Sequence, residues 1–423
     1  MSFEFRWNPY ADQPHNIAPR KERFWYHFRH AGSYVSLAFA NLCKARPILA
    51  LYRKYRKKIY REHVDIETPF ALSVSPSGER NEEVVEALKE LGVRRSLIRI
   101  PSWEMEKLEV YREFSELLVG NKIELTIALL QQRNDVLDPS RWENFLGDVI
   151  PRFAKLSSFF EIGHAWNRTK WGVWDYKEYL KLAYPAMSIA EKYNVELVGP
   201  AVIDFEFHLY PPVLRAVPFD KISSLLYVDR MGAPENTQFG WDTSRKIALL
   251  KAVVDGSSQR RRDLWITEVN WPLKGTGKYS PASGKPNVSE EEQANYLVRY
   301  NILCAASGFV DRIYWWQLVA PGYGLVDSRE KEWRKRPSFY AMKTIISQLE
   351  RSTFTGRVRH QQAEIFAFHK GEHDFAVCWT NGPALDYSFA GRVRRILDRD
   401  GKEIPSSNGR VTIEESPKYV FLK

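Results

Sequence analysis

The 423-residue chain contains few cysteines and none of the common phosphate or zinc motifs. Three cysteines, Cys43, Cys304 and Cys378, lie far apart, which excludes a disulfide framework and a cysteine-based metal cluster, so we expect three buried thiols. No Walker-type loop, His-Glu-x-x-His pair or Gly-x-Ser-x-Gly elbow occurs. The turn Ser75-Pro76-Ser77-Gly78 has a single glycine, unlike a dinucleotide-binding turn. We therefore predict neither a cofactor nor a metal ion.

The sequence also lacks a long apolar run. Residues 1–16 carry charged and polar side chains where a secretory signal needs a continuous apolar core. Residues 24–51 are rich in apolar and aromatic side chains, but no clean stretch of about 20 residues could cross a bilayer. The interruptions are Arg29, Lys44, Arg46 and Pro47. These absences predict a cytoplasmic protein.

Positive charge is concentrated in an N-terminal leader. Residues 1–65 hold 13 Lys or Arg and five Asp or Glu, out of a net charge of +10 for the whole chain. Pro47 predicts the start of a basic amphipathic helix. Its apolar face would be formed by Ile48, Leu51, Tyr52, Tyr55 and Ile59.

This helix has two interpretations that the sequence leaves open. Residues 20–61 could adsorb to an anionic membrane surface, which would place the protein at the inner face of the membrane. Alternatively, the helix packs on the next domain and its basic face is solvated. Nucleic acid is the weakest partner for this charge, because no recognition module accompanies it, and we predict none.

From residue 69 short apolar runs alternate with helical patterns. The runs lie at 70–74, 96–100, 123–130, 159–162, 196–203, 222–228, 264–269 and 311–316. Eight strand–helix units over about 280 residues are typical of a closed parallel barrel, whereas a doubly wound open sheet needs fewer strands. The sequence thus predicts an α/β fold with a (β/α)8 barrel over residues 69–350, after a helical extension over residues 1–68.

Apolar residues stop recurring at helical spacing near residue 352. Short alternating runs follow at 364–368, 375–379, 393–397, 411–413 and 419–422. Turn signals separate them, such as Asn381-Gly382 and Asp400-Gly401. This pattern predicts a small all-β sandwich over residues 351–423.

Glu268 is the first candidate for chemistry. It ends the apolar run Leu264-Trp265-Ile266-Thr267, so a buried strand would deliver its carboxylate to the rim of the barrel, where active sites of this fold lie. An isolated acid in such a place is often a solvated edge residue or half of an ion pair. Four tryptophans, however, could line an apolar pocket that suits sugar rings: Trp265, Trp271, Trp315 and Trp316.

Other polar groups are predicted at the same rim. Carboxylates and a few guanidinium groups follow the other strands, which favours acid–base chemistry on a polar, ring-shaped substrate. They include Arg99, Trp103 and Glu104 after the second strand, His164 and Asn167 after the fourth, Asp204 and Glu206 after the fifth, Asp229 after the sixth and Asp327 after the eighth.

Three of these segments resemble strands two, four and seven of the clan A glycoside hydrolases. They are Ile98-Arg99-Ile100-Pro101-Ser102-Trp103, Phe160-Glu161-Ile162-Gly163-His164-Ala165-Trp166-Asn167-Arg168 and Trp265-Ile266-Thr267-Glu268-Val269-Asn270-Trp271. The sandwich after the barrel resembles the β-xylosidase-like, family 39-like members. The resemblance spans residues 69–423 and implies that Glu268 is the nucleophile, that Arg99 orients it and that Trp316 floors the sugar site.

The fourth segment departs from the family pattern. Where the family has Gly-Asn-Glu-Pro, with the glutamate as general acid and base, this chain has Gly163-His164-Ala165-Trp166. Ala165 can neither donate nor accept a proton, and losing general acid catalysis typically costs about 10²- to 10⁴-fold in rate. The candidate replacements are His164, Glu104, Asp204, Glu206, Asp229 and Asp327. Because an unperturbed imidazole titrates near neutrality, His164 is included with Glu268 as a catalytic candidate.

Two functions remain open from the sequence. One is a glycoside hydrolase that acts on a cell-envelope glycan or other polysaccharide through Glu268 with a non-standard acid. The other is a catalytically inactive protein that binds a glycan or assists polysaccharide assembly with the same cleft. Either would bind an oligosaccharide or polysaccharide, through Arg99, Trp103, Asn167, Asp229, Trp271 and Trp316.

Overall fold

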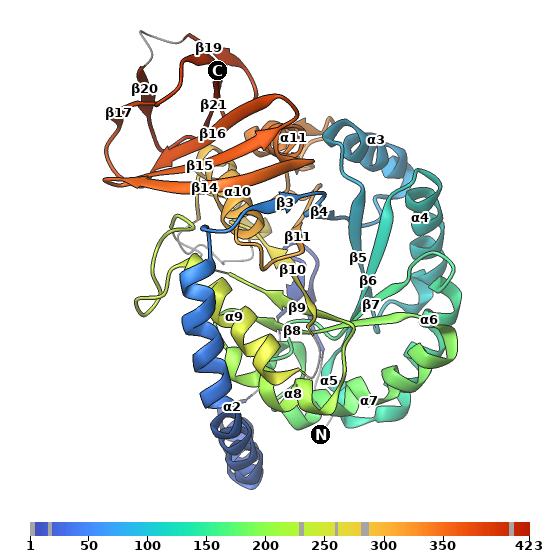
Figure 1. Ribbon diagram of the computed structural model, residues 1–423. Coiled ribbons are helices and arrows are strands. Elements are labelled where there is room, and N and C mark those ends of the chain that lie inside the picture. Colours follow the sequence, from blue (N-terminus) through green and yellow to red (C-terminus); the bar gives the residue numbers. More distant parts are fainter. Residues whose placement is uncertain (1–4, 16–18, 228–231, 259–260, 281–286, 406–409) are drawn as a thin grey trace.

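The computed structural model describes residues 5–15, 19–227, 232–258, 261–280, 287–405 and 410–423 (Figure 1). Its central feature is a closed barrel of eight parallel strands, each paired with the next along the chain and the last with the first. The strands are β4 Phe70–Ser73, β5 Arg95–Pro101, β6 Glu124–Leu130, β7 Phe159–Ile162, β8 Glu196–Ile203, β9 Lys221–Leu225, β10 Asp263–Val269 and β11 Arg312–Trp315. The predicted (β/α)8 barrel is confirmed.

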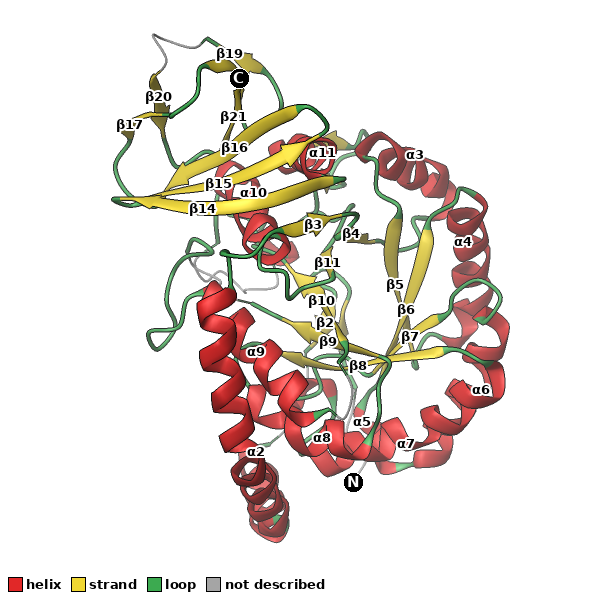
Figure 2. Ribbon diagram, in the orientation of Figure 1, coloured by secondary structure: helices red, strands yellow, loops and turns green. Residues whose placement is uncertain are grey.

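Helices surround this barrel (Figure 2). They are α3 Asn81–Leu91, α4 Leu108–Gly120, α5 Arg133–Leu137, α6 Pro139–Phe153, α7 Tyr176–Tyr193, α8 Tyr210–Ala216, α9 Thr243–Ser257, α10 Glu290–Ala305 and α11 Pro337–Leu349. Local sequence sets several of their ends. Asp175 caps α7, Ser289 and Glu292 form a capping box on α10, and Gly92 ends α3 at a left-handed φ of 79°.

The strands are apolar because both of their faces are covered. In β10, Leu264, Trp265 and Ile266 are each at most 1% exposed. Such continuous burial is typical of parallel sheets covered by helices, and it explains why these strands read as apolar runs rather than alternating ones. Polar residues that occur within or just after these strands, such as Arg99, Glu161 and Glu268, therefore need partners inside the barrel or at its rim.

A C-terminal β-sandwich packs beside the barrel, as predicted. Its larger sheet has the strand order β19-β18-β21-β16-β15-β14-β3, and a ribbon of β17 and β20 covers it through Ile365, Cys378, Val411 and Ile413. The bounds are β14 Ser352–His360, β15 Ala363–Lys370, β16 His373–Thr380, β17 Leu385–Ser388, β18 Val393–Leu397, β19 Glu403–Ile404, β20 Arg410–Ile413 and β21 Lys418–Leu422. The edge strand β3, Val64–Ile66, comes from the leader and pairs with β14.

The leader forms two helices, α1 Arg20–Arg29 and α2 Ala31–Lys58. The predicted helix start at Pro47 is wrong, because Pro47 lies within α2. The predicted apolar face does exist, and it packs on the barrel. The Tyr55 hydroxyl donates to Asp255 of α9 at 2.6 Å, and the Tyr52 ring packs at a tilt against Trp241, with 5.3 Å between the centroids. No described helix is both long and apolar enough to cross a membrane.

One cysteine differs from expectation. Cys304 and Cys378 are buried thiols, but Cys43 is exposed. Cys43 lies next to Leu42 and one helical turn from Phe39 on α2, and both of these residues are also exposed.

Candidate active site

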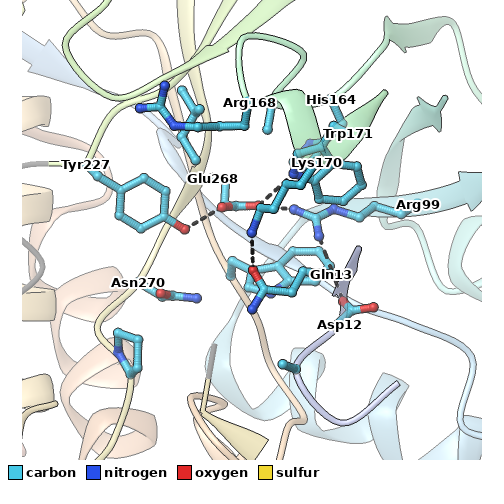
Figure 3. Close-up of a pocket in the computed structure, with 15 residues that line it drawn as sticks. Asp12, Gln13, Arg99, His164, Arg168, Lys170, Trp171, Tyr227, Glu268 and Asn270 are labelled. Atoms are coloured by element: carbon cyan, nitrogen blue, oxygen red, sulfur yellow. Dashed lines mark hydrogen bonds and ion pairs between the residues drawn. The ribbon is translucent and has the colours of Figure 1, made fainter. Parts of the chain in front are cut away.

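Glu268 lies at the carboxyl end of β10, and side chains from four other strand ends converge on it (Figure 3). Arg99 comes from β5, His164 follows β7, Tyr227 follows β9 and Trp316 follows β11. Glu268 is 8% exposed, so its charge is largely shielded from water. The residues that sequence places far apart are thus brought to one mouth of the barrel.

Three donors hold the Glu268 carboxylate. Arg99 Nη2 and His164 Nε2 both approach Oε2, the imidazole at 3.2 Å, and the Tyr227 hydroxyl donates to Oε1. Burial by itself raises the pKa of a carboxyl, but here the charge of Arg99 and the hydrogen bonds outweigh it, so the pKa of Glu268 lies well below that of an ordinary glutamate. Glu268 is therefore an ionised and oriented carboxylate, a group whose chemistry suits an oxygen nucleophile or the stabilisation of positive charge.

His164 is held as a partner of Glu268. Burial and the nearby charge of Arg99 lower the pKa of His164 to about 4, so the ring is neutral near pH 7. A neutral imidazole that faces a carboxylate with Nε2 carries its proton on that nitrogen. The Nδ1 atom has no hydrogen-bond partner among the described residues. This geometry favours orientation of Glu268 over proton donation to a leaving group.

Trp316 forms one wall of the pocket and packs against Arg99. The Arg99 guanidinium lies 3.2 Å from the centre of the Trp316 ring, in cation–π contact. The pocket around Glu268 has a volume of about 110 Å³. Its further lining includes Ala11, Asp12, Gln13, His164, Ala165, Arg168, Lys170, Trp171, Ile203, Tyr227, Asn270 and Pro272.

Position 165, where the resemblance to clan A glycoside hydrolases implies the general acid, lies at this pocket. In this chain it carries only the methyl group of Ala165. Ala165 lines the pocket and is 1% exposed. The nearby Glu161 side chain is buried in the barrel interior and is not among the lining residues. Burial raises the pKa of Glu161 to about 7, which keeps much of it protonated at neutral pH. Glu161 does not reach the place that Ala165 leaves.

The other carboxylates considered from the sequence have cationic or hydroxyl partners. Glu104 accepts from the Tyr111 hydroxyl at 2.6 Å. Asp204 and Glu206 both pair with Arg168, the former at 2.5 Å. Asp327 pairs with Arg329 at 2.7 Å and with Arg336 at 3.0 Å. Asp229 lies outside the described residues.

Three predicted binding residues have other neighbours. Trp103 packs against Phe5 and Trp7 of the N-terminal segment, with the rings tilted relative to each other. Asn167 exchanges two hydrogen bonds with the backbone of Ile203, which fixes the loop after β7. Trp271 is 1% exposed and stacks on Trp315, behind the pocket. Among the described members of the predicted sugar-binding set, Arg99 and Trp316 line the pocket.

Several pocket residues were not predicted from the sequence. Tyr227 lies just past β9, two positions before the predicted Asp229, so the strand end was the signal that could have found it. Lys170 and Trp171 lie in the loop after β7, and Lys170 donates to Gln13. Asp12 comes from the leader, at 3.8 Å from Arg99 Nη1. Burial raises the pKa of Asp12 to about 6, in spite of Arg99.

Comparison with known proteins shows the fold. No protein-family model matches the sequence, and no curated protein matches it. The structure is similar to a family 39 glycoside hydrolase from Bacteroides cellulosilyticus WH2, at a TM-score of 0.66 and 18% identity over 85% of this chain and 81% of the other.

Two further solved structures share the architecture at lower similarity. A family 30 endoxylanase from Clostridium papyrosolvens C71 matches at a TM-score of 0.56, with 11% identity over 86% and 98% of the two chains. A family 51 arabinofuranosidase from Xanthomonas axonopodis pv. citri matches at 0.54, with 14% identity over 87% and 98%. The chain therefore has the (β/α)8 fold of the clan A glycoside hydrolases.

Proposed function

We propose that this chain is a glycoside hydrolase-like protein that acts on an oligosaccharide or polysaccharide with Glu268 as its nucleophile. The observation that carries the proposal is the state of Glu268: an ionised carboxylate at a barrel mouth, held by Arg99, His164 and Tyr227 beside the Trp316 ring. The similar structures include an endoxylanase and an arabinofuranosidase, which supports a saccharide as the ligand.

The chemistry would proceed in two displacements. Glu268 attacks the anomeric carbon, a bond forms between its carboxylate oxygen and that carbon, and the glycosidic oxygen leaves with the bonding electrons. Water then attacks the same carbon, the bond to Glu268 breaks and returns its carboxylate, and the proton of the water passes to the solvent. Because Ala165 offers no proton to the leaving oxygen, the first displacement depends strongly on how well that oxygen bears negative charge. Activated linkages are the expected substrates.

The first prediction concerns Glu268 itself. Glu268→Gln keeps the shape of the side chain but removes its nucleophilic charge. We expect dinitrophenyl glycosides to be hydrolysed by the wild-type chain and the rate to fall on the order of 10³-fold or more in the variant, as for loss of other nucleophiles. Initial rates over a panel of sugars measure this. Glu104→Gln, at the rim but paired with Tyr111, is the matched control. Equal rates for wild type and Glu268→Gln would exclude the mechanism.

Ala165 also supports a second candidate, a protein that binds glycan without cleaving it. Among the described lining residues, carboxyl groups come from Asp12 and Glu268, and Asp12 belongs to the leader. Binding without turnover would give saturable saccharide affinity by calorimetry and no released reducing sugar. Any turnover that depends on Glu268 excludes this candidate.

We further propose that the leader attaches the protein to an anionic membrane surface, through a face that the sequence argument did not select. Val35, Phe39, Leu42 and Leu49 recur at helical spacing on α2 and are 70%, 62%, 74% and 47% exposed. An exposed apolar stripe of this kind is typical of an interaction site. Arg46 and Arg53 continue the same stripe, which suits anionic headgroups.

The start of the leader is tied to the rim of the barrel. The hydroxyls of Tyr26 and Ser33 donate to Asp175 at 3.0 and 3.2 Å. Asp175 belongs to the connection after β7 that also carries His164 and Trp171 to the pocket. Adsorption of the stripe would therefore hold the pocket close to the membrane surface, which suits a cell-envelope glycan.

A further inference from the structure

The first described residues of the chain fold into a small hairpin. β1, Trp7–Asn8, pairs antiparallel with β2, Gln13–Pro14. The Asn8 side-chain oxygen accepts from the backbone N–H groups of Tyr10 and Ala11, at 3.0 and 3.3 Å, and so stabilises the turn. We refer to residues 5–15 as the N-terminal hairpin.

The tip of this hairpin is inside the candidate active site. Ala11, Asp12 and Gln13 line the same pocket as Glu268, and Ala11 is 4% exposed. Asp12 lies 3.8 Å from Nη1 of Arg99, whose other terminal nitrogen holds Glu268. Gln13 accepts a hydrogen bond from Lys170 (Figure 3). A carboxylate and an amide of the chain itself thus occupy polar positions that a saccharide would need.

Aromatic contacts fasten the hairpin to the rim. Phe5 and Trp7 lie 4.4 and 5.1 Å from Trp103, measured between ring centroids. Trp7 also meets Trp171 edge-on at 6.1 Å, and Tyr10 meets Tyr279 at 5.6 Å. Because indole and phenol rings bury large apolar areas, these contacts resist withdrawal of the hairpin. They also occupy Trp103, which the sequence assigned to the sugar.

The space that remains beside Glu268 is too small for a sugar-binding pocket. With the hairpin in place the cavity is about 110 Å³. Ligand pockets typically measure about 300 to 1,000 Å³. A saccharide can reach Glu268 only after the hairpin has left the pocket.

We infer that the N-terminal hairpin is an intramolecular plug that competes with the saccharide for the pocket around Glu268. The contacts of Asp12, Gln13 and Trp7 support closure of the pocket by the hairpin. That this closure controls the access of a saccharide rests on the proposed function. The apparent affinity for any ligand of the pocket is then reduced by the fraction of molecules in which the hairpin is out.

Pocket access can be measured without any sugar. In a Cys43→Ser background, Ala165→Cys places a thiol on the pocket wall, and the rate of modification by a bulky maleimide reports how often the pocket opens. Cys304 and Cys378 are buried and serve as slow references. Trp7→Ala removes the contacts with Trp103 and Trp171, and we expect it to raise the modification rate by about tenfold or more. The matched control is Trp25→Ala, an indole on the same leader that is 53% exposed.

A second variant tests the plug independently of whether Trp7→Ala folds. Tyr10→Ala with Gln13→Ala weakens the hairpin through different contacts, and circular dichroism checks that each variant remains folded. In parallel, dinitrophenyl 2-deoxy-2-fluoroglycosides are tested for covalent modification of chains that retain Ala165. We expect modification to accelerate in both hairpin variants and to stay unchanged in Trp25→Ala.

The outcomes separate the two proposals. Equal maleimide rates in wild-type and hairpin-variant backgrounds overturn the plug, whatever the sugars do. Faster maleimide access with no glycoside reaction in any chain, wild type included, keeps the plug and removes the proposed nucleophile. Faster access in hairpin variants that have lost a glycoside turnover present in the wild-type chain overturns the plug, because the hairpin would then belong to the catalytic apparatus.

Discussion

At the scale of single residues, the proposed nucleophile Glu268 is held by three donors, whereas position 165 carries no acid. Arg99, His164 and Tyr227 all donate to Glu268, so its charge is stabilised before any substrate arrives. His164 is committed to this task and is neutral near pH 7, since the pKa of its ring is lowered to about 4. The residue that would protonate a leaving group is therefore the missing part, and its position is that of Ala165.

Because Glu268 is held in place and an acid is absent, restoring an acid at position 165 should increase the rate of hydrolysis. Ala165→Glu places a carboxyl group on the pocket wall, and we expect it to raise hydrolysis of alkyl glycosides, which have poor leaving groups, by about 10²- to 10⁴-fold. Dinitrophenyl glycosides should change little. The rate of the variant should also fall at alkaline pH as the new carboxyl loses its proton, whereas the wild-type rate should show no such limb. Initial rates against pH check both expectations, with Ala165→Gln as the uncharged control. No rise with alkyl glycosides would contradict this role of position 165.

At the scale of elements, α2 has two apolar faces with different neighbours. One face packs on α9 through Tyr55 and on Trp241, just before α9, through Tyr52. The opposite face exposes Phe39 and Leu42. The sequence identified the first face, because its apolar residues recur among lysines and arginines after Pro47. It could not show that the barrel covers this face, since that depends on the partner helix.

The exposed face of α2 gives a prediction about membrane binding. Burial of an apolar side chain contributes about 1.5–3 kcal/mol, so Phe39→Asp with Leu42→Asp should lower partitioning to phosphatidylserine-containing vesicles by more than about tenfold. Sedimentation with vesicles, with and without phosphatidylserine and at two salt concentrations, measures this. Val110→Asp on α4, at an exposed apolar position of the barrel, is the control. Binding that ignores lipid charge and survives the double substitution would contradict the proposal.

At the scale of the whole molecule, the sequence revealed the parts that are periodic or locally encoded. Buried strands such as residues 159–162 and 196–203 were predicted with the bounds that the structure has, because parallel strands covered on both faces read as apolar runs. Glu268 and Arg99 were found because each ends or lies within such a run. Five C-terminal strands, β15, β16, β18, β20 and β21, were predicted from alternation and turn residues, whereas β14, β17 and β19 were not.

Other parts depend on distant segments and left no local signal. β3 of the leader joins the C-terminal sheet by pairing with β14, across almost 300 residues of sequence. Asp12 and Gln13 reach Arg99 and Lys170 only because the hairpin returns to the barrel mouth. Neither contact has a periodic or compositional signature, so both required the three-dimensional structure.

The central claim is that Glu268 attacks an anomeric carbon, and the most direct test is to trap that bond. Wild-type and Trp7→Ala chains are incubated with a panel of dinitrophenyl 2-deoxy-2-fluoroglycosides, digested and analysed by peptide mass spectrometry. We expect one fluoroglycosyl group per chain, on the peptide containing Glu268, formed faster in Trp7→Ala and absent from Glu268→Gln. Labelling at another residue, or no labelling of Glu268 in either chain, would contradict it.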